Sequence, residues 1–458
     1  MTVDLIKLIA GPLAAVLVTL WAGHAGLTPA AALTLGITLW CALWWITEPV
    51  AIPVTALLPL ALLPLSGVLT PVQVAQAYGN ELILLLAGGF MLSTAMAHSG
   101  AHRRLALYMV RLCGRHSARG LLLGFVLAAG MLSMWISNTA TTLMLLPIAL
   151  AVLDGHPRRA LLAAPLILGV AYGANIGGLG TPIGTPPNLI FMQVYEQTTG
   201  TRIGFLEWMR WGVPILAVFL PLTAFWLGRR LGGIGSPDLP HPGPWRSAEK
   251  RVLAVFALVA LAWVTRGEPF GGWSAWLGLP GANDAAVALL GVVLLCALSD
   301  RHGKRLLDWD TCSRIPWGAL VLFGGGIAIA TAFTASGLSD VAAAHLAGLQ
   351  GLPTLLVIVS ICAGMIFLTE LTSNTASAAL AMPILAAAAL ASGVDPALFM
   401  LPAALAATCA FMLPVGTAPN AIAYGSGEVP ARRMLREGLA LNMIGIVVLS
   451  LASYWLVL

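Results

Sequence analysis

The chain of 458 residues is 59% hydrophobic and only 9% charged, with a mean hydropathy of +0.92. A soluble protein of this length would carry about a quarter charged residues. Apolar runs of about 20 residues, enough to cross a bilayer, recur along the sequence. The composition therefore indicates a polytopic membrane protein. It argues against nucleic acid as a partner despite the net charge of +5. Six scattered cysteines without paired spacing indicate neither a disulfide framework nor a metal site.

In chain order, the apolar segments predict eleven transmembrane helices and two further hydrophobic segments. Two of the eleven are too long for one straight crossing and contain Gly and Pro breaks. A cleaved signal peptide is an alternative for the first helix, but no clear small-x-small site follows it, which favours a retained helix. The expected spans are 8–22, 30–47, 50–66, 81–100, 160–195, 211–228, 252–267, 285–299, 317–338, 396–428 and 438–457, and the two remaining segments are 121–153 and 353–392.

The distribution of Lys and Arg over the connections predicts the orientation of these helices. Only Arg202, Arg210 and Arg266 fall on one side, whereas 20 of the 23 basic residues fall on the other. Because positive residues mark the cytoplasmic face, we expect an inner-membrane protein with its N-terminus inside and its C-terminus outside. The 20 are Lys7, Arg103, Arg104, Arg111, Arg115, Arg119, Arg158, Arg159, Arg229, Arg230, Arg246, Lys250, Arg251, Arg301, Lys304, Arg305, Arg314, Arg432, Arg433 and Arg436.

The same distribution predicts that the two remaining segments are re-entrant hairpins. Segment 121–153 has Arg119 before it and Arg158 after it, so both of its ends are expected on the cytoplasmic side. A full crossing here would reverse the orientation of every later helix. Segment 353–392 lies in a stretch without Lys or Arg, 315–431, and is expected to enter from outside.

Three motifs occur twice, in the same order in each half of the chain. They are a Gly-rich segment, "LAGGFMLSTAMAHSG" at 86–100 and "FGGGIAIATAFTASG" at 323–337; a Ser-Asn-Thr triplet at 137–139 and 373–375; and a break, "GTPPN" at 184–188 and "GTAPN" at 416–420. Because the two hairpins enter from opposite sides, the halves form inverted repeats. Inverted repeats with interrupted helices are typical of secondary transporters, whose site lies at the repeat interface.

The triplets and breaks carry groups that suit both a cation and an anion. Hairpin tips and helix breaks leave backbone groups unpaired, which a membrane tolerates only where protein, water or ligand satisfies them. Helix N-termini suit a carboxylate, while free carbonyls and Ser, Thr or Asn oxygens suit Na⁺. Ser133 and Thr369 each precede their triplet by about one helical turn, so their hydroxyls are expected to point at the same spot. Gly184 and Gly416 allow close approach of the broken helices.

The motifs contain no Lys or Arg, and Glu370 is their only acid. Burying a bare dianion without compensating charge is prohibitive. Two symmetric sites of neutral oxygens would supply two Na⁺ that cancel the charge of a dicarboxylate, and a further ion would make transport electrogenic, at about 2.3 kcal/mol per 100 mV. Glu370 is either a proton relay or a hydrogen-bonding group that shapes the second hairpin.

These motifs resemble those of the divalent-anion/sodium symporter family, most closely its bacterial Na⁺/dicarboxylate members, over nearly the whole chain. The resemblance implies a homodimer in which a mobile transport domain slides as an elevator along a scaffold, carrying Na⁺ with succinate, malate or fumarate. The implied division is 1–115 for scaffold helices 1–4, 116–230 for the first half of the transport domain, 231–345 for scaffold helices 7–9, and 346–458 for its second half.

By position in the motifs, the resemblance also implies the ligands. The first Na⁺ site would use Ser133, Ser137, Asn138 and the Gly184 carbonyl, and the second Thr369, the Thr372 carbonyl, Asn374 and Gly416. The substrate would meet Ser137, Asn138, Thr139 and Thr185 from one half, and Ser373, Asn374, Thr375 and Thr417 from the other. Ala418 departs from the Thr-Pro-Pro common in the family, which bears on substrate choice more than on ion coupling.

The leading hypothesis is therefore a Na⁺-coupled importer of C4-dicarboxylates. Within transport, the alternatives are a sulfate or tricarboxylate substrate, or an exchanger that does not use Na⁺. A gated anion channel on the same scaffold is more remote. An enzyme is the weakest alternative, because the candidate site shows no Ser/His/Asp order, metal-ligand cluster or Gly-rich phosphate loop.

Overall fold

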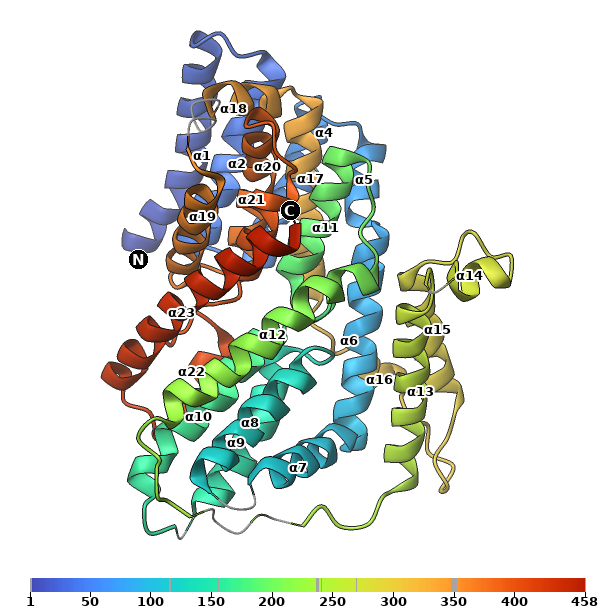
Figure 1. The fold of residues 1–458 in the computed structure, drawn as a ribbon. Coiled ribbons are helices and arrows are strands. Elements are labelled where there is room, and N and C mark those ends of the chain that lie inside the picture. Colours follow the sequence, from blue (N-terminus) through green and yellow to red (C-terminus); the bar gives the residue numbers. More distant parts are fainter. Residues whose placement is uncertain are drawn as a thin grey trace.

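The computed structural model describes residues 2–114, 117–154, 156–235, 239, 241–268, 270–346 and 352–457. Within these ranges the regular elements are helices, and the one β-type contact is an isolated bridge between Ser299 and Arg305. Figure 1 shows the helices in the order of the chain. The predicted all-α fold is confirmed.

The helices fall into four groups along the chain. The first group is α1 (Thr2–His24), α2 (Pro29–Thr47), α3 (Ile52–Thr55), α4 (Leu57–Leu65), α5 (Pro71–Tyr78), α6 (Glu81–Ser99) and α7 (Ala101–Gly114). The second is α8 (Ala118–Ser133), α9 (Asn138–Leu153), α10 (Arg159–Gly177), α11 (Pro186–Thr199) and α12 (Phe205–Gly228). The third is α13 (Ser247–Val264), α14 (Gly272–Trp276), α15 (Asp284–Ala297), α16 (Trp309–Cys312), α17 (Trp317–Ala335) and α18 (Leu338–Leu346). The fourth is α19 (Thr354–Thr369), α20 (Asn374–Ala391), α21 (Ala397–Ala406), α22 (Ala418–Gly425) and α23 (Ala431–Val457).

The sequence predicts eleven spans, two of them interrupted by Gly and Pro. In the described ranges, eight helices are long and apolar enough to cross a membrane. The expected span 50–66 is divided into α3 and α4, because Pro59 has no N–H to donate to the Thr55 carbonyl and the Tyr78 hydroxyl binds the Ala56 carbonyl. The exact number of crossings therefore stays a prediction.

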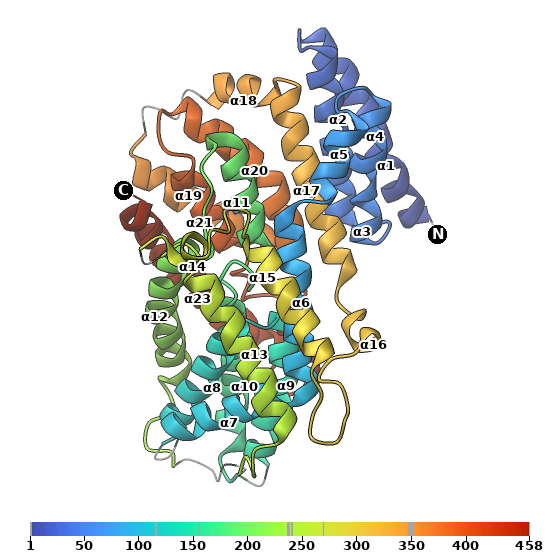
Figure 2. The same cartoon turned by 90° about the vertical axis from the view of Figure 1, so that its right-hand side faces the viewer.

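The two halves of the chain repeat in helix length and order. Helices α6 and α17 both have 19 residues, and α8 and α19 both have 16. Each half then continues with a second hairpin helix, a broken helix pair and a long final helix, α12 or α23. These final helices pack against each other and lie side by side in Figure 1. Figure 2 shows the α1–α5 region at one edge of the molecule, against α17.

Both predicted hairpin segments form two helices that pack together around a short turn. In the first, α8 and α9 have 16 residues each, about 24 Å of helix, which is less than the roughly 30 Å of bilayer hydrocarbon. In the second, α20 has 18 residues and is long enough by itself to span. Re-entrance from opposite sides stays a prediction.

The three basic residues that the topology leaves on the minority side all carry a counter-ion. Arg202 pairs with Glu81, Arg210 with Glu268, and Arg266 with Asp284. The positive-inside rule counts Lys and Arg and gives Asp and Glu little weight, so these pairs do not change the count of 20 against 3. The three arginines therefore stay exceptions to the predicted orientation, each held in an ion pair.

Candidate functional site

The tip of the first hairpin is fixed by its triplet. Ser137 is the N-cap of α9, and its hydroxyl accepts a hydrogen bond from the Ala140 N–H at 3.3 Å. Asn138 follows as the first helical residue, and its Oδ1 accepts a hydrogen bond from the Ser133 hydroxyl at 2.7 Å. Ser133, at the end of α8, is fully buried. The spacing expected from the sequence thus brings the two side chains together.

The second hairpin repeats this contact. The Thr369 hydroxyl lies 2.7 Å from Asn374 Oδ1, and it also lies 2.8 Å from the Ala407 carbonyl, at the end of α21. Ser373 is the N-cap of α20 without a side-chain cap bond. The Thr372 hydroxyl lies 2.5 Å from that of Ser377 and donates to the Leu368 carbonyl, so it stays within the hairpin.

Each broken helix is braced by the asparagine of its Gly-Thr-x-Pro-Asn motif. Between α10 and α11, the Asn188 amide donates to the carbonyls of Gly178 and Thr181 at 2.9 and 2.8 Å. Between α21 and α22, the Asn420 amide donates to the carbonyls of Ala410 and Leu413 at 2.9 and 3.0 Å. This pairing removes several of the unsatisfied carbonyls that a helix break exposes.

Two predicted ligands of the first Na⁺ site converge beside Gly178. A Cβ built on Gly178 would lie 2.8 Å from Asn138 Oδ1 and 3.3 Å from the Gly184 carbonyl oxygen. A side chain at 178 would therefore fill the space that both oxygens face. Neutral carbonyl and amide oxygens are a donor set that suits Na⁺. Among the described residues, no cluster of three or more His, Cys, Asp or Glu could hold a metal instead.

The turn of the second hairpin carries a buried carboxylate, Glu370, that contacts the second break and has no equivalent in the first half. Glu370 accepts hydrogen bonds from the backbone N–H groups of Phe411, Met412 and Leu413 at 2.7 to 2.9 Å, and from the Asn442 amide at 2.8 Å. Of the two roles open from the sequence, these contacts support the structural one. In the first hairpin Met134 stands at the position equivalent to Glu370, and in the first break the N–H groups of Leu179 and Gly180 close tight turns instead.

Ala418 does not shift the second break. Helix α22 begins at Ala418 after the N-cap Thr417, just as α11 begins at Pro186 after the N-cap Thr185. The Thr417 hydroxyl accepts from the Asn420 N–H at 3.2 Å, which fixes this start without a proline at the first position.

Polar contacts connect the two breaks. The Asn175 amide donates to the Thr417 hydroxyl at 3.0 Å and lies 3.4 Å from Asn420 Oδ1. The hydroxyls of Thr185 and Thr408 lie 3.5 Å apart, and the Tyr172 hydroxyl donates to the Phe411 carbonyl at 2.7 Å. The repeat interface is therefore a connected polar layer inside an apolar protein.

One cavity of about 710 Å³ opens onto both tips and both breaks. All predicted site residues except Ser133 and Thr369 line it, and these two are fully buried behind Asn138 and Asn374. Its lining from the predicted set is Ser137, Asn138, Thr139, Gly184, Thr185, Thr372, Ser373, Asn374, Thr375, Gly416 and Thr417.

The cavity also has walls that the motifs do not contain. Asn175, Glu48 and Arg314 line it, together with Pro316. Asn175 is an asparagine within an apolar span, and this sequence feature could have identified it as a site residue. Arg314 was used only in counting the basic residues on each side of the membrane. Glu48 has a left-handed backbone, with φ 46° and ψ 50°, which is uncommon for a residue other than glycine and recurs at functional sites.

An all-helical membrane protein with duplicated broken helices around a shared polar cavity has the architecture of a secondary transporter. The chain matches the family described as "Sodium:sulfate symporter transmembrane region" over residues 2–458. The protein therefore belongs to this family of sodium-coupled anion symporters, as the motifs predicted.

Curated relatives match over nearly the full length. The chain is 39% identical over 477 residues to the sodium-dependent dicarboxylate transporter SdcS of Staphylococcus saprophyticus, and 39% identical over 478 residues to SdcS of Staphylococcus aureus strain MRSA252. Each match covers 99% of this chain and 91% of the relative.

Solved structures share the fold at low identity. The Alcanivorax borkumensis YdaH transporter aligns with a TM-score of 0.57 at 14% identity, covering 83% of this chain and 87% of that one. MtrF of Neisseria gonorrhoeae aligns with a TM-score of 0.56 at 13% identity, covering 83% and 82%. At this identity the likeness shows the fold alone.

Proposed function

We propose that the protein is a sodium-coupled secondary transporter that imports C4-dicarboxylates such as succinate, malate or fumarate. The single observation that carries the proposal is the duplicated hydroxyl–asparagine contact, Ser133 with Asn138 and Thr369 with Asn374, facing one cavity. The full-length similarity to proteins named sodium-dependent dicarboxylate transporters supports the choice of ion and substrate.

The proposed first Na⁺ site uses Ser133, Ser137, Asn138 and the Gly184 carbonyl, and the second uses Thr369, the Thr372 carbonyl, Asn374 and Gly416. The substrate carboxylates then meet the N-terminal ends of α9 and α20, where Ser137, Thr139, Ser373 and Thr375 present donors, with Thr185 and Thr417 beside them. The Na⁺ ions supply the positive charge that lowers the cost of burying a dianion.

Arg314 and Glu48 fit this scheme as further residues that line the cavity. Both line the cavity, and neither belongs to the hairpins or the breaks. Their charges are opposite, so together they add no net charge to the site. The guanidinium provides a fixed donor for one substrate carboxylate without replacing the sodium ions as the main source of positive charge.

The proposed movement is an elevator in which α8–α12 and α19–α23 form the transport domain. The support is that these helices pack across the repeat, α10 against α22, α11 against α21, and α12 against α23. The proposed assembly is a homodimer in the cell's inner membrane, with the N-terminus inside and the C-terminus outside. The orientation rests on the distribution of the basic residues.

Uptake of radiolabelled succinate into proteoliposomes tests this function. We expect uptake to follow an inward Na⁺ gradient and to cease when choline replaces Na⁺. Competition by unlabelled malate, fumarate, citrate and sulfate then ranks the substrate class. Uptake that persists unchanged in choline would instead identify an exchanger that does not use Na⁺.

Two variants test the site itself. Asn138→Ala and Asn374→Ala are each expected to abolish Na⁺-dependent uptake while the protein still inserts, because each removes an oxygen that faces the cavity. Asn80→Ala is a matched control, since Asn80 caps α6 outside the cavity. Normal uptake in either site variant would exclude that asparagine from the site.

A further inference from the structure

A second cavity, of about 680 Å³, lies away from the repeat interface and is strongly basic. It is formed by the end of α6, the start of α13 and the connection that follows α15. Six cationic side chains and one carboxylate, Asp300, line it. The six cations are Arg246, Lys250, Arg251, Arg301, Lys304 and Arg305.

The acids near this cavity are already engaged. Asp300 Oδ1 accepts hydrogen bonds from the backbone N–H groups of His302 and Lys304 at 2.8 and 3.0 Å. Glu249 is buried and shared by Arg104 and Arg246. In the described part of the chain, Lys250, Arg301 and Lys304 form no ion pair. Six cations line the cavity against one lining carboxylate, and among the described residues only Arg246 is paired, with Glu249, so a net positive charge remains that favours an anion.

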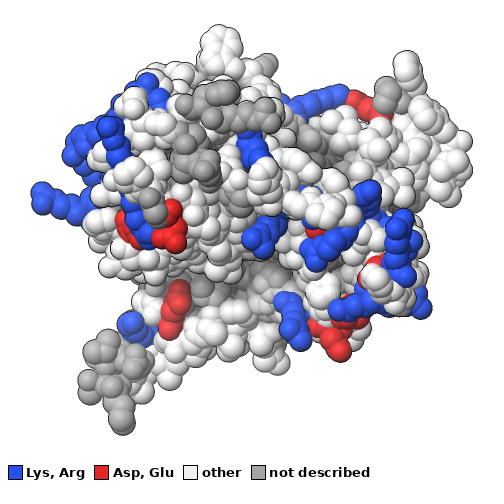
Figure 3. All heavy atoms as spheres, turned by 90° about the horizontal axis from the view of Figure 1, so that it is seen from below, with Lys and Arg blue, Asp and Glu red and all other residues white. Residues whose placement is uncertain are grey.

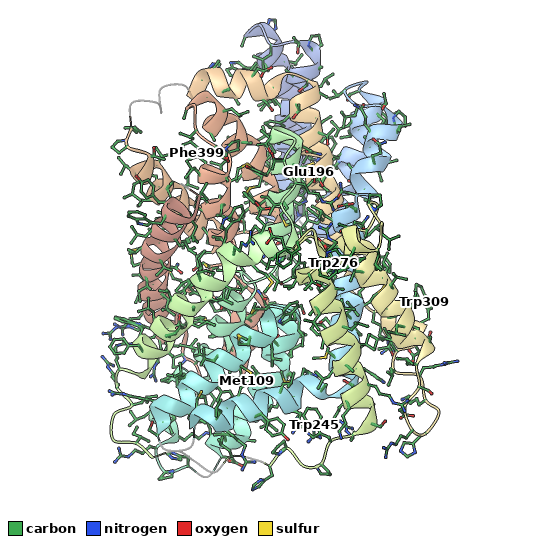
Figure 4. All side chains as sticks on the ribbon, turned by 45° about the vertical axis from the view of Figure 1, so that its right-hand side comes forward. Met109, Glu196, Trp245, Trp276, Trp309 and Phe399 are labelled. Atoms are coloured by element: carbon green, nitrogen blue, oxygen red, sulfur yellow. The ribbon has the colours of Figure 1, made fainter. Side chains whose placement is uncertain are left out.

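An aromatic side chain bounds this cavity on the side of α7. Trp245 lines it, stacks on Tyr108 at 5.9 Å between ring centroids, and lies under the guanidinium of Arg104. Figure 4 shows Trp245 at the lower end of the molecule, near α7. Figure 3, a view of this end, shows the Lys and Arg side chains gathered on it. A tryptophan next to basic residues is typical of the membrane–water interface.

An apolar groove of about 430 Å³ lies further along α13, between α13 and α15. On α13, Arg251 lines the basic cavity, while Leu258, Ala262 and Thr265 line the groove. Intervals of seven, four and three residues place these four on one helix face. Leu258 lies eight residues beyond Lys250, about 12 Å along the axis. The basic cavity and the apolar groove therefore both lie along α13, which is at the edge of the molecule in Figure 1.

We propose that this surface binds an anionic phospholipid, with the phosphate headgroup in the basic cavity and an acyl chain along the α13–α15 groove. The charge complementarity selects an anion, and the adjoining groove selects a lipid over a free phosphate compound. The site is separate from the transport cavity, with which it shares no lining residue.

Native mass spectrometry of the full-length protein in detergent tests the headgroup site. Palmitoyl-oleoyl phosphatidylglycerol is expected to bind at least tenfold more tightly than phosphatidylcholine with the same chains. Lys250→Gln combined with Arg301→Gln should weaken phosphatidylglycerol binding about tenfold, since basic residues near an anionic headgroup each contribute to affinity.

Arg158→Gln with Arg432→Gln is the matched control. It removes the same charge from exposed positions outside the cavity and should leave phosphatidylglycerol binding unchanged. Equal binding of the two lipids, or an equal loss in both double variants, would overturn the proposal.

Two further arms separate a lipid from other occupants. Leu261→Trp, at a groove residue that is 61% exposed, should weaken phosphatidylglycerol binding severalfold, whereas Leu20→Trp, at a residue on α1 that is 59% exposed, should not. Glycerol 1-phosphate at equal concentration should fail to displace the lipid. Displacement would reassign the cavity to a free phosphate compound. A shift of oligomeric state in Leu261→Trp with lipid binding unchanged would reassign the groove to a second copy of the chain.

Discussion

The Asn175 amide donates a hydrogen bond to the Thr417 hydroxyl at 3.0 Å and so joins the broken helix of the first half to that of the second. Both residues are buried, and both line the central cavity. A contact at this point links the two repeats beside the cavity.

This bond predicts energetic coupling between the two side chains. Asn175→Ala and Thr417→Val should each destabilise the protein, and a double-mutant cycle should give a coupling free energy of about 1 kcal/mol, the usual net value of one hydrogen bond. Unfolding in detergent micelles measures it. Thr417→Ser keeps the hydroxyl and should retain the coupling. Strictly additive effects would mean that the bond contributes nothing.

The close packing around Gly178 allows a steric test of the proposed first Na⁺ site. In Gly178→Ala the new Cβ would approach Asn138 Oδ1 to 2.8 Å and occupy the space beside the Gly184 carbonyl. The Na⁺ concentration for half-maximal uptake should rise at least about tenfold, the equivalent of 1.4 kcal/mol. Gly364→Ala is the matched control, because a Cβ there meets nothing within 4 Å. An unchanged Na⁺ dependence in Gly178→Ala would place the ion elsewhere.

A variant of Glu370 can test whether this residue is a structural carboxylate or a proton relay. Glu370→Gln should destabilise the protein by about 1–3 kcal/mol, because hydrogen bonds to a charged acceptor are stronger than neutral ones, and Glu370→Ala should cost more. The pH profile of uptake should keep its shape in Glu370→Gln. A profile that loses an ionisation in this variant would instead identify Glu370 as the relay.

Two of the ion pairs on the side with few basic residues should contribute differently to stability when one charge is removed. The Asp284 side chain is 6% exposed beside Arg266, whereas the Arg210–Glu268 pair is more than half exposed. Arg266→Gln should therefore cost about 3–5 kcal/mol of stability, and Arg210→Gln no more than about 1 kcal/mol. Unfolding of both variants in the same detergent gives the comparison. Equal losses would show that the burial of Asp284 has no energetic effect.

The parts of the site set by local geometry were predictable from the sequence. Ser133 and Thr369 were assigned from spacing, and the structure places each beside its asparagine because one helical turn and a capped tip leave little freedom. Asn175 was missed because its partner Thr417 lies 242 residues away. The role of Glu370 could not be decided for the same reason, since its donors lie about 40 residues further along the chain.

The fold class and the repeats were also predictable, because hydropathy and duplicated motifs record them directly. Proline interrupts one of the predicted spans at Pro59, where the apolar run divides into α3 and α4. Hydropathy counts that run as one helix because the scale contains no term for a missing backbone donor. The cavity walls at Glu48 and Arg314 depend on how distant segments pack, which no local pattern encodes.

The hydroxyls of Ser133 and Thr369 bear on the step of the proposed transport cycle in which the carrier returns without its ions. Each hydroxyl donates a hydrogen bond to its asparagine oxygen, so in the proposed cycle the departure of Na⁺ would not leave that oxygen without a partner in a dry interior. The ion-free form of the proposed carrier would then return without the cost of an unsatisfied acceptor, while an arriving Na⁺ would first have to turn the hydroxyl aside. Such competition favours weak, rapidly reversible ion capture, which suits repeated cycling better than tight retention.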